Sequence, residues 1–294
     1  MSTSNFGSKL TGSIPSISSS AMLVELNISL WTGRKFDKSV SQDIDAQKHT
    51  TTRAGNYHKN LIADEPNFQA VNKFGGMSRT YHYEVTMPWS DSGQRLLTTP
   101  LYFDYQKEMT GREQEFYRLR DVAIHDWDNM INRARVKLGD LFNAEDYPHK
   151  DEIADKYRFS IRYTPVPEVG DWRVDVGNEA VRSLQDSYAE HYQTNLNQAY
   201  KNVWDRTYKV LSDMSTKLDG NNKQIFRDTL VTNVKDMIDL LDKFNITNDD
   251  KMRRAKVKLQ DVMLGITPDA LREDDDLRLD TKSKVDSLLK EFSW

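Results

Sequence analysis

The chain has 294 residues, and its formal net charge of −4 gives no general electrostatic reason to expect binding to nucleic acid or to a membrane surface. It contains no cysteine, which excludes disulfides, thiol nucleophiles and thiolate metal sites and fits a reducing compartment. Charged residues make up 29% of the chain and hydrophobic residues 37%, a balance typical of an elongated helical protein with a large surface.

The amino-terminal residues 1–20 are rich in serine, glycine and threonine and lack the apolar block of a signal peptide. We therefore expect them to form a disordered tail. No apolar run in the sequence approaches the roughly 20 residues that a membrane-spanning helix needs. The sequence thus predicts a cytoplasmic protein that does not interact with membranes.

Residues 21–101 are predicted to form an amino-terminal segment that contains strands. Residues 21–31 (AMLVELNISLW) and residues 78–87 (SRTYHYEVTM) alternate apolar or aromatic side chains with polar ones. This two-residue period is typical of a half-buried strand. One or two short helices are expected in the polar residues 36–71 between them.

Residues 102–265 are predicted to form a bundle of long helices. In residues 102–142 apolar side chains recur about every 3.5 positions, the period of a helix, with a mild interruption at Gly111. Residues 178–219 keep one apolar stripe with no proline or glycine, which predicts a single helix roughly 60 Å long. Two shorter helices are expected to follow, over residues 226–244 and 251–264.

A small β module is predicted to interrupt this bundle at residues 157–176. Residues 157–163 (YRFSIRY) alternate, and residues 172–176 (WRVDV) are expected to return beside them after a rigid loop with two prolines. A short helix over residues 150–156 precedes the module, which is expected to cap one end of a helical hairpin.

The carboxy-terminal residues 266–294 are predicted to contain an acidic linker, residues 272–280, and a last helix that ends at Trp294. The predicted fold class is α+β and mainly α, with a long antiparallel helical hairpin or bundle and a small β module.

Motifs that carry catalysis or cofactor binding are missing from the sequence. It contains no phosphate-binding loop, no dinucleotide-binding glycine pattern, no zinc-protease motif and no nucleophile elbow. None of the six histidines lies three or four residues from another, the spacing that would place two metal ligands on one helix face. We therefore expect no catalytic residue, no metal site and no cofactor, and hence a protein that is not an enzyme.

Two stretches have the composition of a nucleic-acid interface. Residues 53–83 interleave aromatic and basic side chains, which suits stacking on single-stranded nucleic acid but is also typical of half-buried packing residues. The cations of residues 251–258 could follow a phosphate backbone, or lie on a solvated helix side neutralised by the acidic residues 273–276. The second interpretation is favoured in both cases. The candidate contacts of the later stretch are Lys251, Arg253, Arg254, Lys256 and Lys258.

The helix predicted over residues 178–219 is also rich in large aromatic side chains, which admit two interpretations of nearly equal weight. They pack inside the chain, most simply against the helix 102–142, with their polar tips at the edge. Alternatively they form a self-association face, because aromatic residues are enriched in subunit interfaces. The residues concerned are Tyr188, Tyr192, Tyr200, Trp204 and Tyr208.

Four stretches together resemble a known family: LNISLWTGR (residues 26–34), AGNYHKNL (54–61), TMPWSDSGQRLL (86–97) and residues 147–176. The chain resembles, over about residues 22–290, an uncharacterised domain family of bacteriophages and some bacteria. Members are often encoded near MoxR-type or cobalt-chelatase-like AAA+ ATPases. The family has no established catalytic residues, so the resemblance implies a phage or bacterial cytoplasmic protein and a helical partner of such an ATPase.

The leading hypothesis is a non-catalytic, phage-encoded helical interaction protein that forms a homo-oligomer through its long helices and acts as partner or adaptor of an AAA+ ATPase. The alternative is a nucleic-acid-binding protein, for single-stranded DNA, of phage replication or recombination. A virion structural protein is the third hypothesis.

Overall fold

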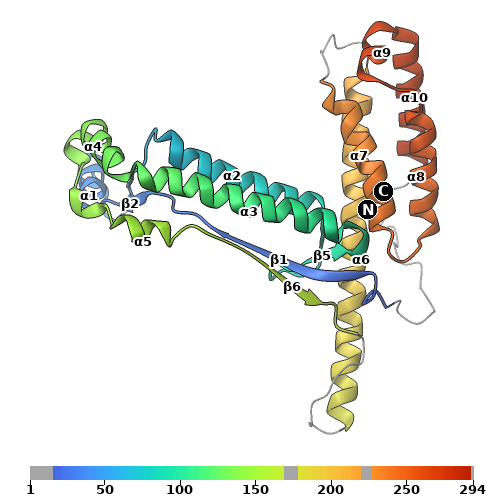
Figure 1. The fold of residues 1–294 in the computed structure, drawn as a ribbon, viewed down its shortest axis with the longest axis horizontal. Coiled ribbons are helices and arrows are strands. Elements are labelled where there is room, and N and C mark those ends of the chain that lie inside the picture. Colours follow the sequence, from blue (N-terminus) through green and yellow to red (C-terminus); the bar gives the residue numbers. More distant parts are fainter. Residues whose placement is uncertain (1–15, 169–177, 220–226, 293–294) are drawn as a thin grey trace. The chain divides into compact units, whose positions relative to one another are not determined.

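The computed structural model describes residues 16–168, 178–219 and 227–292 of the chain. Most of these residues lie in helices, accompanied by a small four-stranded sheet, so the predicted fold class, α+β and mainly α, is confirmed. Figure 1 shows the helices and strands coloured along the chain. Within these described ranges, no helix is both long enough and apolar enough to cross a lipid bilayer.

The chain folds into two compact units, and each unit is assembled from segments that are separated in the sequence. Unit 1 takes the described residues of 1–25, 84–103 and 163–294, and unit 2 consists of residues 26–83 and 104–162. The segment 102–265, which the sequence suggested would form one bundle, is thus divided between the two units.

The helix predicted over residues 102–142 is two helices, α3 (Tyr102–His125) and α4 (Trp127–Leu138). They are separated at Asp126, and α4 and most of α3 belong to unit 2. Gly111 lies inside α3 without interrupting it. Burial of an apolar stripe thus outweighs the roughly 1 kcal/mol that a helical glycine costs relative to alanine.

Residues 66–84 form the helix α2 (Pro66–Glu84), so the strand predicted over residues 78–87 is wrong. The buried positions of α2 recur every three or four residues, the helical period, but several of them carry small or polar side chains that hide the pattern. Only the last residue of the predicted strand, Met87, lies in a strand, β4 (Met87–Pro88). The buried residues of α2 are Phe68, Val71, Gly75, Ser78 and His82.

The core of unit 2 is aromatic. The ring centroid of Trp127 lies 5.4 Å from that of Trp31 and 5.7 Å from that of Phe68. Tyr157 and Phe116 extend this cluster, with 6.3 Å between their centroids. Tilted and edge-on contacts of this kind are the favoured geometry of aromatic pairs, so residues distant in the sequence fasten the unit together.

Smaller elements complete unit 2. The strands β2 and β3 pair antiparallel, with Lys35 opposite Lys59. The short helices predicted in residues 36–71 and 150–156 are confirmed by α1 and α5. The bounds are β2 Arg34–Phe36, α1 Lys38–Gln47, β3 His58–Asn60, η2 Gly139–Leu141, η3 Ala144–Asp146 and α5 Lys150–Ala154.

The four-stranded sheet has the order β4-β5-β1-β6. Its strands include β5 (Arg95–Thr98), β1 (Ala21–Ser29) and β6 (Arg158–Pro165), which confirms the strands predicted over residues 21–31 and 157–163. In unit 1, β1 pairs antiparallel with β5, and Leu23 lies opposite Leu96. The return strand predicted over residues 172–176 lies outside the described residues.

Unit 1 is built on α6 (Asn178–Lys217), which confirms the predicted single long helix. Its buried residues begin at Tyr192 and continue to Met214, and this part packs against α7 (Thr229–Phe244), α10 (Asp275–Glu291) and β4. One of the two interpretations of the aromatic residues was packing against the helix 102–142, most of which belongs to unit 2. Within unit 1 the α7–α10 region takes that role.

The remaining helices of unit 1 are α8 (Asp250–Met263) and α9 (Pro268–Glu273), with the 3-10 turn η1 (Thr99–Leu101) before α3. The acidic linker predicted over residues 272–280 is wrong, because α9 and α10 occupy it with Asp274 between them. The Asp274 carboxylate caps α10 by accepting from the backbone N–H of Leu277. Acidic residues at a helix start are stabilised by the helix dipole, so the charge run begins a helix rather than preventing one.

Candidate functional site

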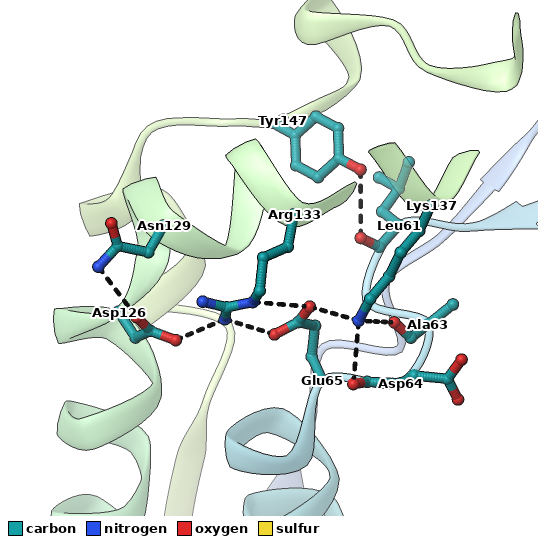
Figure 2. Close-up of polar contacts among 9 residues, drawn as sticks. All are labelled: Leu61, Ala63, Asp64, Glu65, Asp126, Asn129, Arg133, Lys137 and Tyr147. Atoms are coloured by element: carbon teal, nitrogen blue, oxygen red, sulfur yellow. Dashed lines mark hydrogen bonds and ion pairs between the residues drawn. The ribbon is translucent and has the colours of Figure 1, made fainter. Parts of the chain in front are cut away.

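A buried carboxylate next to the start of α2 holds a polar network in unit 2 (Figure 2). The side chain of Glu65 is only 3% exposed. Arg133 donates to both of its oxygens, at 3.3 Å from Nε and 2.6 Å from Nη2. Lys137, one turn further along α4, donates to the same carboxylate at 2.9 Å. The i,i+4 spacing places both cations on one helix face, so α4 presents a preformed clamp for Glu65.

The electrostatic balance of this network favours the ionised carboxylate. Burial opposes ionisation of Glu65, but the hydrogen bonds and charges of Arg133 and Lys137 outweigh it and hold the pKa of Glu65 below its usual value. Arg133 also donates to Asp126 at 2.6 Å, and the hydrogen bond from Arg133 lowers the pKa of Asp126. Lys137 also donates to the carbonyl oxygens of Ala63 and Asp64, so its three N–H groups have acceptors.

A second buried ion network surrounds Lys59 of β3, which is 6% exposed. Its ammonium group lies 2.6 Å from Asp146 Oδ2 and 3.3 Å from Asp37 Oδ2, and it donates to the carbonyl oxygen of Leu141 at 3.0 Å. Burial lowers the pKa of Lys59, but the hydrogen bonds to Asp146 and Asp37 outweigh it and raise the pKa above its usual value. Lys59 therefore stays charged inside the unit.

The Glu65 network joins the residues after β3 to α4, and the Lys59 network joins β3 to the residues that follow α4. Tyr147 adds a third tie, because its hydroxyl donates to the carbonyl oxygen of Leu61 at 3.2 Å (Figure 2). Burial raises the pKa of this phenol to about 12. Each carboxylate faces cations rather than an open cavity, so the networks have the geometry of structural clamps and not of a paired acid and base.

The described residues contain no group of three or more histidine, aspartate or glutamate side chains arranged to hold a metal ion. A groove of about 600 Å³ lies between α2 and α3, over Phe74, Met77 and Tyr81. At its rim, Arg112 lies 2.8 Å from Glu108 and 4.7 Å above the Tyr81 ring.

Several aromatic and basic residues of 53–83 pack within unit 2. Phe68 lies in the aromatic core, Lys59 is buried among carboxylates, and Arg79 donates to the carbonyl oxygen of Ile28. Tyr81 stacks on Tyr105, with 6.3 Å between the ring centroids. These side chains therefore do not form the open stacking surface that single-stranded nucleic acid requires.

The five cations predicted as nucleic-acid contacts all lie on α8, and each has a partner within unit 1. Lys256 pairs with Asp242 at 2.8 Å, and Lys258 pairs with Glu291. Arg253 pairs with Asp250, whose backbone carbonyl accepts from Arg254. Lys251 lies 5.1 Å above the ring of Trp204. The neutralising acids are Asp242, Asp250 and Glu291, not the predicted acidic residues 273–276.

The five aromatic residues of α6 do not share one exposed face. At about 100° per residue they spread over roughly 200° of the helix circumference. Tyr192 is 2% exposed, and its hydroxyl accepts from the backbone N–H of Ile17. Tyr200 bonds to Thr247 through its hydroxyl, and Trp204 stacks on Phe292.

The other two aromatic residues of α6 are less covered. Tyr188 is half-buried, and its hydroxyl donates to the carbonyl oxygen of Pro167 at 3.1 Å, while Tyr208 is 44% exposed. Of the predicted self-association residues, Tyr192, Tyr200 and Trp204 therefore serve intramolecular packing, and the predicted face is wrong for Tyr192, which is buried.

The first turns of α6 are less buried than the rest of this helix. None of residues 178–191 is buried, whereas the stripe from Tyr192 onward is. In Figure 1 this amino-terminal part of α6, in yellow, extends beyond α7, α8 and α10. The apolar stripe continues into it through Val181, Leu184 and Tyr188, and Leu184 is 36% exposed. Residues 178–191 are called the α6 extension below.

The sequence contained a signal for the α6 extension that the aromatic residues obscured. The apolar stripe begins at Val181, but its largest side chains, the tyrosines and the tryptophan, lie further along the helix. The stripe alone could not reveal that its coverage begins at Tyr192, because Tyr192 is contacted by Ile17 and Trp89, which are distant in the sequence.

Comparisons of the chain with protein-family models, with curated proteins and with solved structures give no match.

Proposed function

We propose that the protein is a non-catalytic helical interaction protein that self-associates through the α6 extension. The observation that supports this proposal is the continuation of the α6 apolar stripe, through Val181 and Leu184, beyond the elements that bury it. An isolated helix of about 14 residues is marginal in water, so a helical extension of this length gains stability by burying its apolar side chains against another helix.

The non-catalytic part of the proposal is supported by the two ion networks of unit 2. Glu65 and Lys59 are the most buried ionisable groups of these networks, and their charges are balanced by partners at hydrogen-bond distance. A general acid or base needs an open position beside a substrate, which neither arrangement offers.

The resemblance to the phage and bacterial family adds a partner to the proposal. We further propose that the assembled, phage-encoded chain acts in the cytoplasm as partner or adaptor of an AAA+ ATPase. Light scattering on a mixture of the chain with a MoxR-type AAA+ ATPase tests this part, and two unchanged separate masses would contradict it.

Nucleic-acid binding through residues 251–258 has less support. Three of its cations face carboxylates within unit 1, namely Lys256, Lys258 and Arg253. A phosphate backbone could pair with these cations only by displacing the carboxylates. That displacement would offset the free energy of binding that counterion release supplies.

The experiment that tests self-association is size-exclusion chromatography with light scattering over a range of protein concentrations. We expect the mass of the wild-type chain to rise above 34.2 kDa with concentration. The variant Leu184→Asp should stay at the monomer mass, because it places a charge within the exposed stripe.

A matched control is Leu264→Asp, since Leu264 is also an exposed leucine of unit 1, 81% exposed, but lies after the end of α8. It should associate like the wild type. A wild-type chain that stays monomeric at every concentration would contradict the proposal, as would association that Leu184→Asp leaves unchanged.

A further inference from the structure

We propose that the α6 extension of one copy docks in the groove between α2 and α3 of a second copy, so that the chain associates head to tail. This inference rests on the proposed function, because it assumes that the chain self-associates through the extension. It adds the surface that receives the extension, and it predicts a contact between two different surfaces rather than between two identical ones.

The groove is formed by the outer flanks of two neighbouring helices of unit 2, which Figure 1 shows side by side. On α2 it is lined by Phe74, Met77 and Tyr81, which follow one another at positions i, i+3 and i+7. At about 100° per residue these three side chains fall within roughly 60° of the helix circumference. Met77 is 51% exposed. An open groove with such a ridge is a shape that an amphipathic helix fills.

Gly111 leaves one point of the α3 wall without a side chain. It lies inside α3 and lines the groove, and a Cβ atom added to it would meet nothing within 4 Å. Packing within unit 2 therefore does not require glycine here, although glycine costs about 1 kcal/mol relative to alanine in a helix. The missing side chain leaves room for a side chain of a docked helix.

The two walls of the groove differ in polarity. The α2 wall consists of two aromatic side chains and a methionine, whereas the α3 wall carries charges of both signs. A helix that fits between them is apolar along one edge of its buried side and polar along the other. The charged residues of the α3 wall are Asp104, Lys107, Glu108 and Arg112.

The α6 extension matches both walls. Val181, Leu184 and Tyr188 have the same i, i+3 and i+7 spacing as the three residues of α2, so the two ridges can interdigitate. Leu184 lies at one edge of this stripe and Gln185 at the other, about 100° apart. Leu184 thus suits the α2 wall. Gln185 suits the α3 wall, because an amide side chain can donate to carboxylates and accept from cations.

The carboxylates of the extension lie on its other side. Glu179, Asp186 and Glu190 fall roughly 150–170° from the centre of the stripe, so they stay in solvent when the stripe is buried. Ala180 and Ala189 lie about 90° from that centre, one on each flank. Small flanking residues let the extension settle between two walls instead of resting on one.

The size of the contact sets its expected strength. Eight residues line the groove, and the extension is roughly 20 Å long. Such a contact lies at or below the lower end of the ~1,200–2,000 Å² that stable specific interfaces bury, so we expect dissociation at micromolar concentrations or above.

Filling the groove tests the receiving surface. Gly111→Gln should weaken self-association by about tenfold or more, because its side chain occupies the space that the extension needs. It should not destabilise unit 2 in urea unfolding, since the site is open and glutamine is the better helix former. Met77→Glu, which places a charge on the apolar wall, should weaken association similarly.

The matched control is Gly76→Gln. Gly76 is also a glycine inside a helix of unit 2 at which an added Cβ atom would meet nothing within 4 Å, but it does not line the groove. This variant should associate like the wild type. A loss equal to that of Gly111→Gln would overturn the assignment of the groove.

A mixture of two defective variants tests the head-to-tail contact. Leu184→Asp keeps an intact groove, and Gly111→Gln keeps an intact extension. Alone, each should stay at the monomer mass of 34.2 kDa at concentrations where the wild type associates. Their equimolar mixture should form a heterodimer and stop at twice that mass, because the one intact extension occupies the one intact groove.

The outcomes separate the two proposals. A wild-type chain that stays monomeric at every concentration overturns both. Association that Leu184→Asp abolishes, but that Gly111→Gln and Met77→Glu leave unchanged, overturns the groove and leaves self-association through the extension standing. A mixture that stays monomeric overturns the head-to-tail contact in the same way. Loss in each groove variant, wild-type behaviour of Gly76→Gln and a heterodimer in the mixture together support it.

Discussion

At the scale of single residues, the buried charged side chains of unit 2 connect segments that are separated in the sequence. Glu65 forms ion pairs with two cations of α4, and Lys59 forms ion pairs with two carboxylates from separate segments. Taking such charges out of water is costly, and removing one partner leaves the others uncompensated. The networks therefore specify how the loops of unit 2 join α4 more than they add net stability.

Replacement of Glu65 by glutamine should make the stability of unit 2 less sensitive to acid. The pKa of Glu65 is lower in the folded protein than its usual value of 4.5. Its charge therefore contributes stability that is present above about pH 4.5 and is lost as the pH falls through the folded pKa. At about pH 7 we expect Glu65→Gln to cost about 1–3 kcal/mol in urea unfolding, because a charged hydrogen-bond acceptor is removed.

The difference between the wild type and Glu65→Gln should shrink as the pH is lowered to about 3.5. The control is Glu115→Gln, which removes an exposed partner of Arg118 on α3 and should change little, since surface ion pairs are weak. A difference between wild type and Glu65→Gln that is the same at both pH values would contradict this account.

The sequence revealed which residues of this kind exist but not which of them meet. Lys59, Asp37 and Asp146 lie in three separate segments, and nothing in their spacing predicts a common contact. Lys256 and Lys258 of α8 show the same limit, because their partners Asp242 and Glu291 lie on neighbouring helices. Pairing across elements depends on packing angles that single-sequence patterns do not contain.

At the scale of elements, two neighbouring glycines of α2 offer a matched test of helix packing. A Cβ atom added at Gly76 would meet nothing within 4 Å, whereas one added at Gly75 would lie 3.1 Å from the Leu30 side chain. Alanine is the better helix former by about 1 kcal/mol. We therefore expect Gly76→Ala to stabilise unit 2 by up to about 1 kcal/mol in urea unfolding.

Gly75→Ala should gain clearly less than Gly76→Ala or destabilise the unit, because the helix gain is offset by the contact with Leu30. Equal effects of the two substitutions would show that α2 does not pack against Leu30 through this face.

The elements that the sequence predicted well are those whose apolar pattern is carried by large side chains. The single helix α6 and the strand β1 are examples. The errors arose where small or polar residues are buried, as in α2, or where a charge run caps a helix, as at the start of α10. In each case a tertiary contact or a helix cap determined the secondary structure, whereas the local composition favoured a different one.

At the scale of the whole molecule, the chain passes between two units instead of forming one bundle. The sequence could not predict this, because the segments of each unit are separated by segments of the other. The division assigns the ion networks to unit 2 and the α6 extension to unit 1, so each can be altered separately.

The central claim is that the α6 extension is buried by another copy of the chain. Hydrogen exchange of its backbone amides, measured at about 1 μM and at several hundred micromolar protein, tests this claim most directly. We expect exchange in residues 182–190 to slow as the concentration rises, while residues 196–214 stay protected throughout and Leu184→Asp shows no such dependence. Exchange in residues 182–190 that is the same at both concentrations in the wild-type chain would contradict the claim.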